Sequence, residues 1–325
     1  MVSIIKELYK KIVKIIKDYD EIVLVRHIGP DPDAIASQIA LRDSIKLTFP
    51  NKEVYAVGAG VHKFKYLGNL DKVELSELNN ALMIVLDVPN FARLDGVDDL
   101  EYKAILKIDH HPQEDIIGDV DWTDDTKSST CEMIAELIMN TKLVMDQKIA
   151  ENLYIGMVFD SDRFLLQNTT VNTFKTVYDL LNTSKINFVP LYDNLYERSL
   201  VEEKFRAYII NNLKISENKF GFIFVDADVL KKYGVEPTIV SNQVNDFYFI
   251  KELICWLFVV YDERNNIYKA NIRSCGPVIN EVASKYNGGG HKFASGCITD
   301  DYKIIEKLAK DLDEACKDYI TEENN

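Results

Sequence analysis

The stretch Leu-Lys-Ile-Asp-His-His-Pro-Gln, residues 106–113, joins an apolar run to three polar side chains in succession. The apolar run predicts a buried strand. Pro112 favours extended geometry at His111 and ends the strand, so that Asp109, His110 and His111 lie together at its carboxyl end. A chain with only 5 histidines therefore places two of them at one strand end.

Similar apolar runs recur through the first third of the chain and alternate with helical patterns. The expected strands cover residues 22–25, 54–57, 82–86 and 104–108, and the expected helices cover residues 34–47, 129–139 and 147–158. Strands that alternate with helices are typical of a mostly parallel sheet with helices on both faces. We therefore predict an α/β domain.

The second half of the chain follows a different pattern. A polar, helix-like stretch runs from Pro190 to about Asn212, and a glycine cluster and a final amphipathic helix come later. Between them, β-rich runs cover residues 220–225, 254–261 and 267–272. The change of period predicts a smaller C-terminal α/β domain joined by a helical linker. We expect a first domain over residues 1–190, and the linker with the second domain over residues 191–325.

Charge and cysteine content narrow the class of protein. The 325-residue chain has 38 Lys and Arg against 52 Asp and Glu, a net charge of −14, which disfavours binding to long duplex nucleic acid. Residues 1–17 repeat apolar positions at helical spacing between lysines, which predicts an amphipathic helix instead of a signal peptide or membrane span. Five cysteines without a C-x-x-C pair indicate reduced thiols. We expect a cytoplasmic protein with no membrane partner.

Metal-capable side chains follow three of the four expected strands and one further apolar segment. They are His27, Asp31 and Asp33 after the first strand, Asp87 after the third, Asp109, His110 and His111 after the fourth, and Asp160 after residues 153–159. Because ligands of open parallel sheets bind at the carboxyl ends of the strands, these groups should meet at one edge. Carboxylates mixed with imidazoles suit Mn²⁺, with Zn²⁺ and Fe²⁺ as competitors. Two ions about 4 Å apart would clamp a phosphoryl group, and a bridging hydroxide could attack phosphorus.

Each of these residues also has a structural interpretation when it is taken alone. Asp33 could be a helix N-cap, and Asp87 before Val-Pro could be a turn residue. His27 could be a hydrogen-bonded core histidine, and Asp160 could belong to an exposed acidic turn. Unrelated caps and turns have no reason to follow successive strands, so the combination favours a metal centre.

The ordered motifs resemble a known family. The motifs His27-x-x-Pro30-Asp31-x-Asp33, Asp87, Asp109-His110-His111 and Asp160 are similar in order and separation to those of the DHH phosphoesterase superfamily, and Ser-Ser-Thr-Cys-Glu at 128–132 is similar to its Ser-Thr-rich segment. One departure is Asp160-Ser-Asp-Arg-Phe164, where the family often has Asp-Thr-Gly-x-Phe. This departure places an extra carboxylate, Asp162, beside the expected metals.

The resemblance implies a role for each motif residue. One divalent ion would be held by His27, Asp31, Asp87 and Asp160, and the other by Asp33, Asp87, His110 and Asp160. Asp87 and Asp160 would therefore bridge the two ions. His111 would contact the scissile phosphate, and Asp109 would orient a histidine or a metal-bound water.

The C-terminal half is similar to the DHH-associated substrate-binding domain. The similarity lies in Ala-Asn-Ile-Arg-Ser at 270–274, Asn-Gly-Gly-Gly-His at 287–291 and Ala-Ser-Gly at 294–296. It implies a phosphate site formed by Arg273, Ser274, Gly288, Gly289, Gly290 and His291. Alone, the three glycines would indicate a flexible hairpin turn. Together with His291 and Arg273, they favour a loop whose backbone approaches the ligand closely and binds its phosphate.

Two-domain chains of this size with a Gly-Gly-Gly-His loop most resemble nano-RNases. The resemblance implies a Mn²⁺-dependent hydrolase that releases mononucleotides from very short oligoribonucleotides and AMP from 3′-phosphoadenosine 5′-phosphate. The alternatives are a phosphodiesterase for cyclic di-AMP or pApA, and a nucleotide sensor without turnover. A soluble inorganic pyrophosphatase is disfavoured by the glycine loop. The expected partners are short RNA or nucleotide bisphosphates. The sequence does not decide between a monomer and a homodimer.

Overall fold

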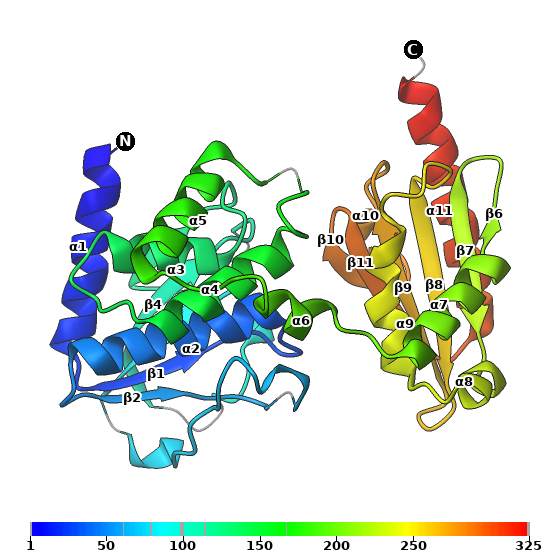
Figure 1. The fold of residues 1–325 in the computed structure, drawn as a ribbon. Coiled ribbons are helices and arrows are strands. Elements are labelled where there is room, and N and C mark those ends of the chain that lie inside the picture. Colours follow the sequence, from blue (N-terminus) through cyan, green and yellow to red (C-terminus); the bar gives the residue numbers. More distant parts are fainter. Residues whose placement is uncertain are drawn as a thin grey trace. The chain divides into compact units, whose positions relative to one another are not determined.

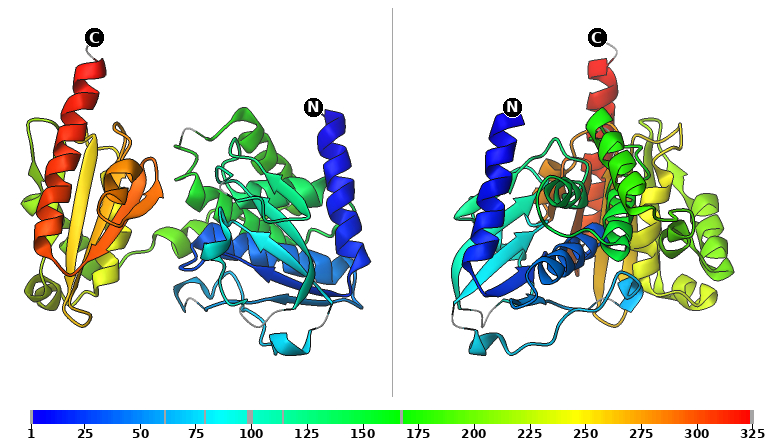
Figure 2. Two further views of the ribbon diagram at one scale, coloured as in Figure 1. Left: turned by 180° about the vertical axis from the view of Figure 1, so that it is seen from behind. Right: turned by 60° about the vertical axis from the view of Figure 1, so that its left-hand side comes forward.

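The computed structural model describes residues 2–60, 62–78, 80–97, 101–113, 115–166 and 168–323. The chain divides into two compact units, Met1–Glu197 and Arg198–Asn325. Figures 1 and 2 show the helices and strands of each unit.

The N-terminal unit is built on a five-stranded sheet (Figure 1). Its strands are β1 Glu21–Val25, β2 Glu53–Ala56, β3 Ala81–Leu86, β4 Tyr102–Asp109 and β5 Val120–Thr123. All neighbouring strands are parallel, in the order β2-β1-β3-β4-β5. The four strands expected from the sequence are present, and β5 adds a fifth. The carboxyl ends of β1, β3 and β4 therefore share one edge.

The two faces of this sheet are covered differently. The helices are α1 Val2–Asp18, α2 Pro32–Thr48, α3 Thr130–Met139, α4 Gln147–Asp160, α5 Val171–Ser184 and α6 Leu191–Tyr196. Side chains alternate along β1, so that Ile22 and Leu24 pack into a core with α1 to α5, while Val23 and Val25 face the other side. In the described residues, that other side is completed by loops and the 3-10 helix Leu75–Glu77. The α/β class is confirmed, but α-helices cover one face instead of both, because the segments after β2 and β3 form loops and 3-10 turns.

The C-terminal unit contains a mixed sheet. Its strands are β6 Lys214–Ile215, β7 Phe220–Val225, β8 Cys255–Asp262, β9 Ile267–Ser274, β10 Gly289–His291 and β11 Ala294–Thr299, in the order β10-β11-β9-β8-β7-β6. The pair β7–β8 is parallel, and the other neighbours are antiparallel. The three β-rich runs expected from the sequence correspond to β7, β8 and β9.

Helices cover both faces of this second sheet. They are α7 Leu200–Asn212, α8 Ala227–Tyr233, α9 Pro237–Gln243, α10 Asn280–Ser284 and α11 Tyr302–Glu323. One core joins the sheet to α10 and α11, and a separate core joins its other face to α7, α8 and α9. Although α11 spans 22 residues, no helix in the described part of the chain is long and apolar enough to cross a membrane.

The stretch expected as one helical linker forms two helices. Helix α6 packs on α4 through Tyr154 and Tyr192, whose hydroxyl oxygens lie 2.9 Å apart. Helix α7 begins after Ser199, whose side chain accepts a hydrogen bond from the backbone N–H of Glu202, and it packs on α8. The division between the units therefore falls after residue 197, whereas the sequence placed it after residue 190.

Candidate metal centre

Asp87 lies at the centre of a buried polar cluster. It directly follows β3 and has φ of 59°, a left-handed conformation that is uncommon for residues other than glycine. Its carboxylate is buried, and the hydroxyl of Thr130 donates a hydrogen bond of 3.1 Å to Oδ1. The left-handed turn thus directs Asp87 toward the sheet edge instead of continuing the strand.

His27 approaches Asp87 from the neighbouring strand. It lies two residues after the end of β1, and its backbone pairs with that of Leu94 in a single antiparallel β-bridge. Its Nδ1 lies 3.0 Å from the carbonyl oxygen of Ile28, which sets Nδ1 as the donor and leaves Nε2 as the nitrogen that faces Asp87 Oδ2 at 3.5 Å. A histidine that donates one ring N–H to a backbone carbonyl is well oriented to bind a metal through the other nitrogen.

The two aspartates at the start of α2 have separate roles. Asp31 is the N-cap, and its carboxylate accepts a hydrogen bond from the backbone N–H of Ala34. Asp33 lies within the first turn and is fully buried, and it accepts hydrogen bonds from the backbone N–H groups of Thr130 and Cys131 at 2.8 and 2.9 Å. The helix cap that the sequence suggested for Asp33 is therefore provided by Asp31.

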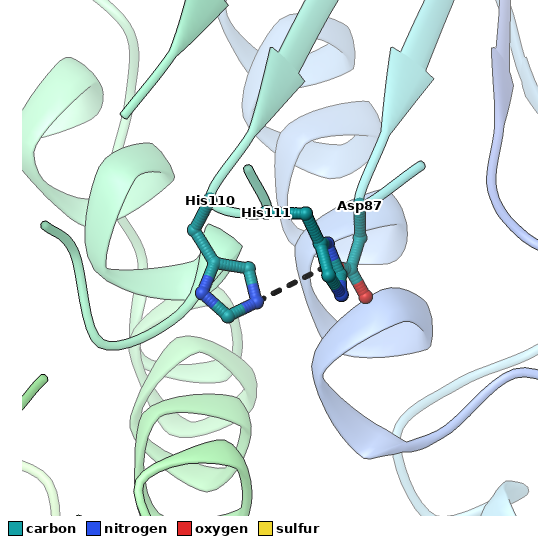
Figure 3. A group of neighbouring side chains, drawn as sticks. All are labelled: Asp87, His110 and His111. Atoms are coloured by element: carbon teal, nitrogen blue, oxygen red, sulfur yellow. Dashed lines mark ion pairs between the residues drawn. The ribbon is translucent and has the colours of Figure 1, made fainter. Parts of the chain in front are cut away.

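His110 and Asp160 complete the cluster from β4 and α4. His110 Nε2 lies 3.5 Å from Asp87 Oδ1 and 3.2 Å from Asp160 Oδ2, and its Nδ1 lies 3.4 Å from the carbonyl oxygen of Lys127. Asp160 is the last residue of α4, so a helix end contributes to an edge otherwise formed by strand ends. Figure 3 shows His110, His111 and Asp87 directed toward one another from adjacent strands.

His111 is held mainly by Asp109. Asp109 Oδ1 lies 2.8 Å from His111 Nδ1 and also accepts a hydrogen bond of 3.2 Å from the His111 backbone N–H. His111 Nδ1 lies 3.4 Å from Asp87 Oδ1 as well. The ring is therefore fixed through Nδ1, and Nε2 is the nitrogen that can meet a substrate.

The carboxylates of this cluster influence one another's ionisation. Burial and the charges of Asp87 and Asp160 raise the pKa of Asp33 well above its ordinary value, and burial and the charges of Asp31 and Asp87 do the same for the pKa of Asp160. Burial alone would also raise the pKa of Asp87, but the hydrogen bond with His27 and the charges of His111 and His110 lower it well below the usual range. Carboxylates this close do not all ionise without a compensating positive charge.

Three groups of side chains have the spacing that a metal ion needs. Within each group, the potential ligand atoms lie within 4.8 Å of one another, and the groups are His27 with Asp31 and Asp87, Asp33 with His110 and Asp160, and Asp87 with His110 and His111. Oxygen and imidazole ligands of this kind suit divalent Mn, Fe or Zn. All six residues predicted as metal ligands thus lie in one connected cluster.

Comparison with known proteins identifies the family. Residues 21–157 match the model of the DHH family, N-terminal domain, and residues 221–318 match the DHHA1 domain. The chain is 37% identical over 315 residues to the "Bifunctional oligoribonuclease and PAP phosphatase NrnA" of Bacillus subtilis (strain 168), covering 95% of this chain and 99% of that protein. The chain belongs to the DHH family.

Two further relatives support the family assignment and the fold. The "Probable bifunctional oligoribonuclease and PAP phosphatase NrnA" of Streptococcus mutans is 34% identical over 298 residues, covering 92% of this chain and 95% of that protein. The crystal structure of an exopolyphosphatase-related protein from Bacteroides fragilis superposes with a TM-score of 0.84 at 22% identity, covering 96% of this chain and 98% of that one, which shows a shared fold. The resemblance read from the sequence is confirmed: this DHH protein is a hydrolase of a metal-dependent family.

The departure at Asp162 has a local explanation. Asp162, Arg163 and Phe164 have φ of 44°, 64° and 66°, so three successive residues after α4 are left-handed. The Asp162 carboxylate accepts a hydrogen bond of 2.7 Å from Arg163, whose guanidinium lies over the ring of Tyr196. Within the described residues, Asp162 belongs to none of the three metal-capable groups. The extra carboxylate that the sequence placed beside the metals is instead turned toward Arg163.

The C-terminal residues predicted to bind substrate fall into different environments. Arg273 Nε donates a hydrogen bond of 2.8 Å to Asn245, and Nη1 donates one of 2.9 Å to the carbonyl of Ile272. Among the described residues, no carboxylate forms an ion pair with Arg273. Burial lowers the pKa of Arg273 to about 10. A half-buried guanidinium without a carboxylate is suited to bind an anion.

Ser274 requires a correction. Its side chain is fully buried, its hydroxyl donates to the carbonyl of Pro277 at 2.7 Å, and it accepts a hydrogen bond from the backbone N–H of Gly276. Alternation along β9 turns Ser274 into the core while Arg273 faces the other side. Ser274 therefore supports the loop after β9 and has no surface for a phosphate.

Two of the three glycines form a strand edge instead of a flexible turn. Gly289 and Gly290 lie in β10, which pairs with β11. Gly290 has φ of 131°, and a Cβ on Gly288 would lie 2.5 Å from the carbonyl oxygen of Gly296. A Cβ on Gly289 would meet open space, so this backbone is accessible to a ligand. The side chain of His291, also predicted to bind phosphate, is outside the described part of the structure.

The sequence analysis assigned no role to two residues that shape the centre. Thr130 donates to Asp87 through its hydroxyl and to Asp33 through its backbone N–H. Lys107 is fully buried in β4, and its Nζ lies 3.3 Å from Asp109 Oδ2. The signal for Lys107 was available, because it is a charged residue inside the apolar run at 104–108.

Proposed function

We propose that this DHH protein hydrolyses very short oligoribonucleotides to mononucleotides and 3′-phosphoadenosine 5′-phosphate to AMP. The observation that carries the proposal is the buried cluster around Asp87, found in a chain that is 37% identical over 95% of its length to a protein named for both activities. The net charge of −14 also disfavours long polyanions and is compatible with short substrates.

The donor set fits two divalent cations, with Mn²⁺ as our first choice. His27 and Asp31 would hold one ion, Asp33 and His110 would hold the other, and Asp87 and Asp160 would be shared by both. Cations bound there would supply positive charge for the phosphoryl oxygens and would activate water for attack on phosphorus. The raised pKa values of Asp33 and Asp160 support this assignment, because burial and the neighbouring carboxylates make their ionisation unfavourable unless a positive charge lies close by.

The protein's own groups then position the substrate. His111, fixed by Asp109 through Nδ1, would direct Nε2 to an oxygen of the scissile phosphate. In the C-terminal unit, Arg273 and the backbone of Gly289 would bind phosphate, with His291 as a further proposed contact.

A substrate panel tests the proposal. The purified protein is incubated with Mn²⁺ and, separately, with di- to pentaribonucleotides, 3′-phosphoadenosine 5′-phosphate, cyclic di-AMP and pApA, and products are separated by chromatography. We expect mononucleotides from the short RNAs and AMP from the bisphosphate. Faster turnover of cyclic di-AMP than of every linear substrate would overturn the substrate assignment. Tight nucleotide binding without any product would indicate a sensor instead.

A further inference from the structure

Lys107 is a buried cation that the proposed chemistry does not use. Its side chain is fully buried near the carboxyl end of β4, where an unpaired ammonium would be strongly unfavourable. Its Nζ lies 3.3 Å from Asp109 Oδ2, 3.4 Å from the carbonyl oxygen of Pro89 and 3.5 Å from the carbonyl oxygen of Asp115. The ammonium therefore lies between two carbonyl oxygens, to which it donates hydrogen bonds, and one carboxylate oxygen, with which it forms an ion pair.

The three oxygens belong to segments that carry the metal centre. Pro89 lies two residues after Asp87, in the loop after β3, and Asp115 lies in the segment that follows His111. The two segments also contact each other, because the backbone N–H of Asp115 donates to the carbonyl of Pro89 and its carboxylate accepts from the N–H of Phe91. Lys107 thus donates hydrogen bonds to both loops.

Asp109 links Lys107 to His111. One oxygen of the carboxylate, Oδ2, contacts the Lys107 ammonium, and the other, Oδ1, contacts Nδ1 and the backbone N–H of His111. Asp109 is fully buried, and a buried carboxylate depends on a positive partner to keep its charge and orientation. Loss of the ammonium would leave Asp109 free to rotate away from His111.

We propose that Lys107 is a positioning residue: through Asp109, it fixes the ring of His111 with Nδ1 engaged and Nε2 presented to the scissile phosphate. The inference rests on the proposed function only in assigning the phosphate contact to His111. The arrangement of Lys107, Asp109 and His111 itself can be tested without a substrate.

A double-mutant cycle tests the coupling on whichever phosphodiester the wild type hydrolyses fastest, with Mn²⁺ at saturation. We expect Lys107→Met to lower kcat about 10–100-fold with little change in KM, as is usual for residues that orient ligands of a metal site. In the His111→Ala background, the same change should cost no more than about 3-fold, because the group it positions is absent. If the effects of Lys107→Met and His111→Ala multiply, the proposal is wrong.

Lys52 provides a matched control. Its Nζ also contacts two backbone carbonyls and one carboxylate, those of Lys17, Tyr19 and Asp20, but at the amino edge of the same sheet. Lys52→Met should lower the melting temperature while kcat stays within about 2-fold of wild type. An equal loss of kcat in Lys52→Met and Lys107→Met would show that Lys107 only stabilises the fold, and it would contradict the proposal.

An NMR measurement separates this inference from the proposed function. In metal-free protein labelled with ¹⁵N-histidine, we expect a slowly exchanging ring N–H resonance that His111→Ala removes, that Lys52→Met retains and that Lys107→Met loses. Retention in folded Lys107→Met would overturn the proposal even if no nucleotide substrate were found. If Lys107→Met does not fold, Lys107→Gln, which loses the charge but keeps a donor, takes its place in both experiments.

Discussion

The carboxylate of Asp33 accepts a hydrogen bond of 2.8 Å from the backbone N–H of Thr130, 97 residues further along the chain. Asp33 lies in the first turn of α2 and Thr130 begins α3, so one buried side chain joins the first turns of two helices. The same carboxylate is a candidate metal ligand. The centre is therefore built into the packing of the N-terminal unit, and changes to its charge should alter folding stability as well as activity.

Asp160→Asn should stabilise the metal-free protein at pH 7. The pKa of Asp160 is raised by burial and by the charges of Asp31 and Asp87, so in the folded state its ionisation is unfavourable above the ordinary carboxyl pKa. The amide removes that cost, and we expect a gain on the order of 1 kcal/mol in the unfolding of the N-terminal unit. Chemical denaturation at pH 7 and pH 4 measures it, with the two proteins converging at pH 4. A less stable variant at pH 7 would contradict the electrostatic account.

Asp87→Asn should have the opposite effect. The pKa of Asp87 is lowered by His27, His111 and His110 against the effect of burial, so its ionised form contributes stability above the ordinary carboxyl pKa and loses it as the pH falls. Asparagine tolerates the φ of 59°, so the backbone should be retained. We expect a loss of about 1–3 kcal/mol at pH 7, measured by the same denaturation, together with loss of metal binding. Equal shifts for Asp87→Asn and Asp160→Asn would show that the two carboxylates are equivalent.

Metal binding should release protons. Burial opposes the protonation of His27, but the hydrogen bond with Asp87 and the charges of Asp87 and Asp31 raise its pKa to about 9. His27 is therefore protonated at pH 7 without a metal, and it must lose that proton to coordinate one. Calorimetric titration with Mn²⁺ in buffers of different ionisation enthalpy should report release of about one proton or more, with affinity rising from pH 6 to pH 9. Affinity independent of pH would exclude His27 as a ligand.

Asp162→Gly should leave the metal centre intact. Glycine adopts the left-handed conformation at φ of 44° without strain, and the lost carboxylate contacts Arg163 instead of the metal-capable groups. We expect Mn²⁺ affinity and kcat within about 3-fold of wild type and a stability change below about 1 kcal/mol. Calorimetry and thermal unfolding provide the measurements. A large fall in Mn²⁺ affinity would show that Asp162 contributes to the metal site.

The strand ends were predictable from the sequence because each motif directly follows an apolar run. Asp87 and the triplet Asp109-His110-His111 come immediately after β3 and β4, and parallel strands bring their carboxyl ends to one edge. Strand β5 was not predicted, because Val-Asp-Trp-Thr at 120–123 is short and alternates polar with apolar residues. Alternation is itself the signal of a half-buried strand, but over only four residues it does not separate an edge strand from a loop.

Side-chain pairing across the fold could not be predicted in the same way. The contact between Asp33 and α3 depends on how two helices pack, and nothing in the residues near Asp33 specifies it. Ser274 shows the converse problem, since it lies beside Arg273 in the sequence but faces the core. Motif adjacency indicates which residues are near a site, whereas strand alternation and helix packing decide which of them reach it.

The most direct test of the metal centre is an anomalous difference map from crystals of the protein soaked in Mn²⁺ and measured at the manganese absorption edge. We predict two peaks about 4 Å apart, with Asp87 and Asp160 contacting both, His27 and Asp31 on one side and Asp33 and His110 on the other. A map without paired peaks among these six side chains, in crystals where Mn²⁺ is bound elsewhere, would contradict the account.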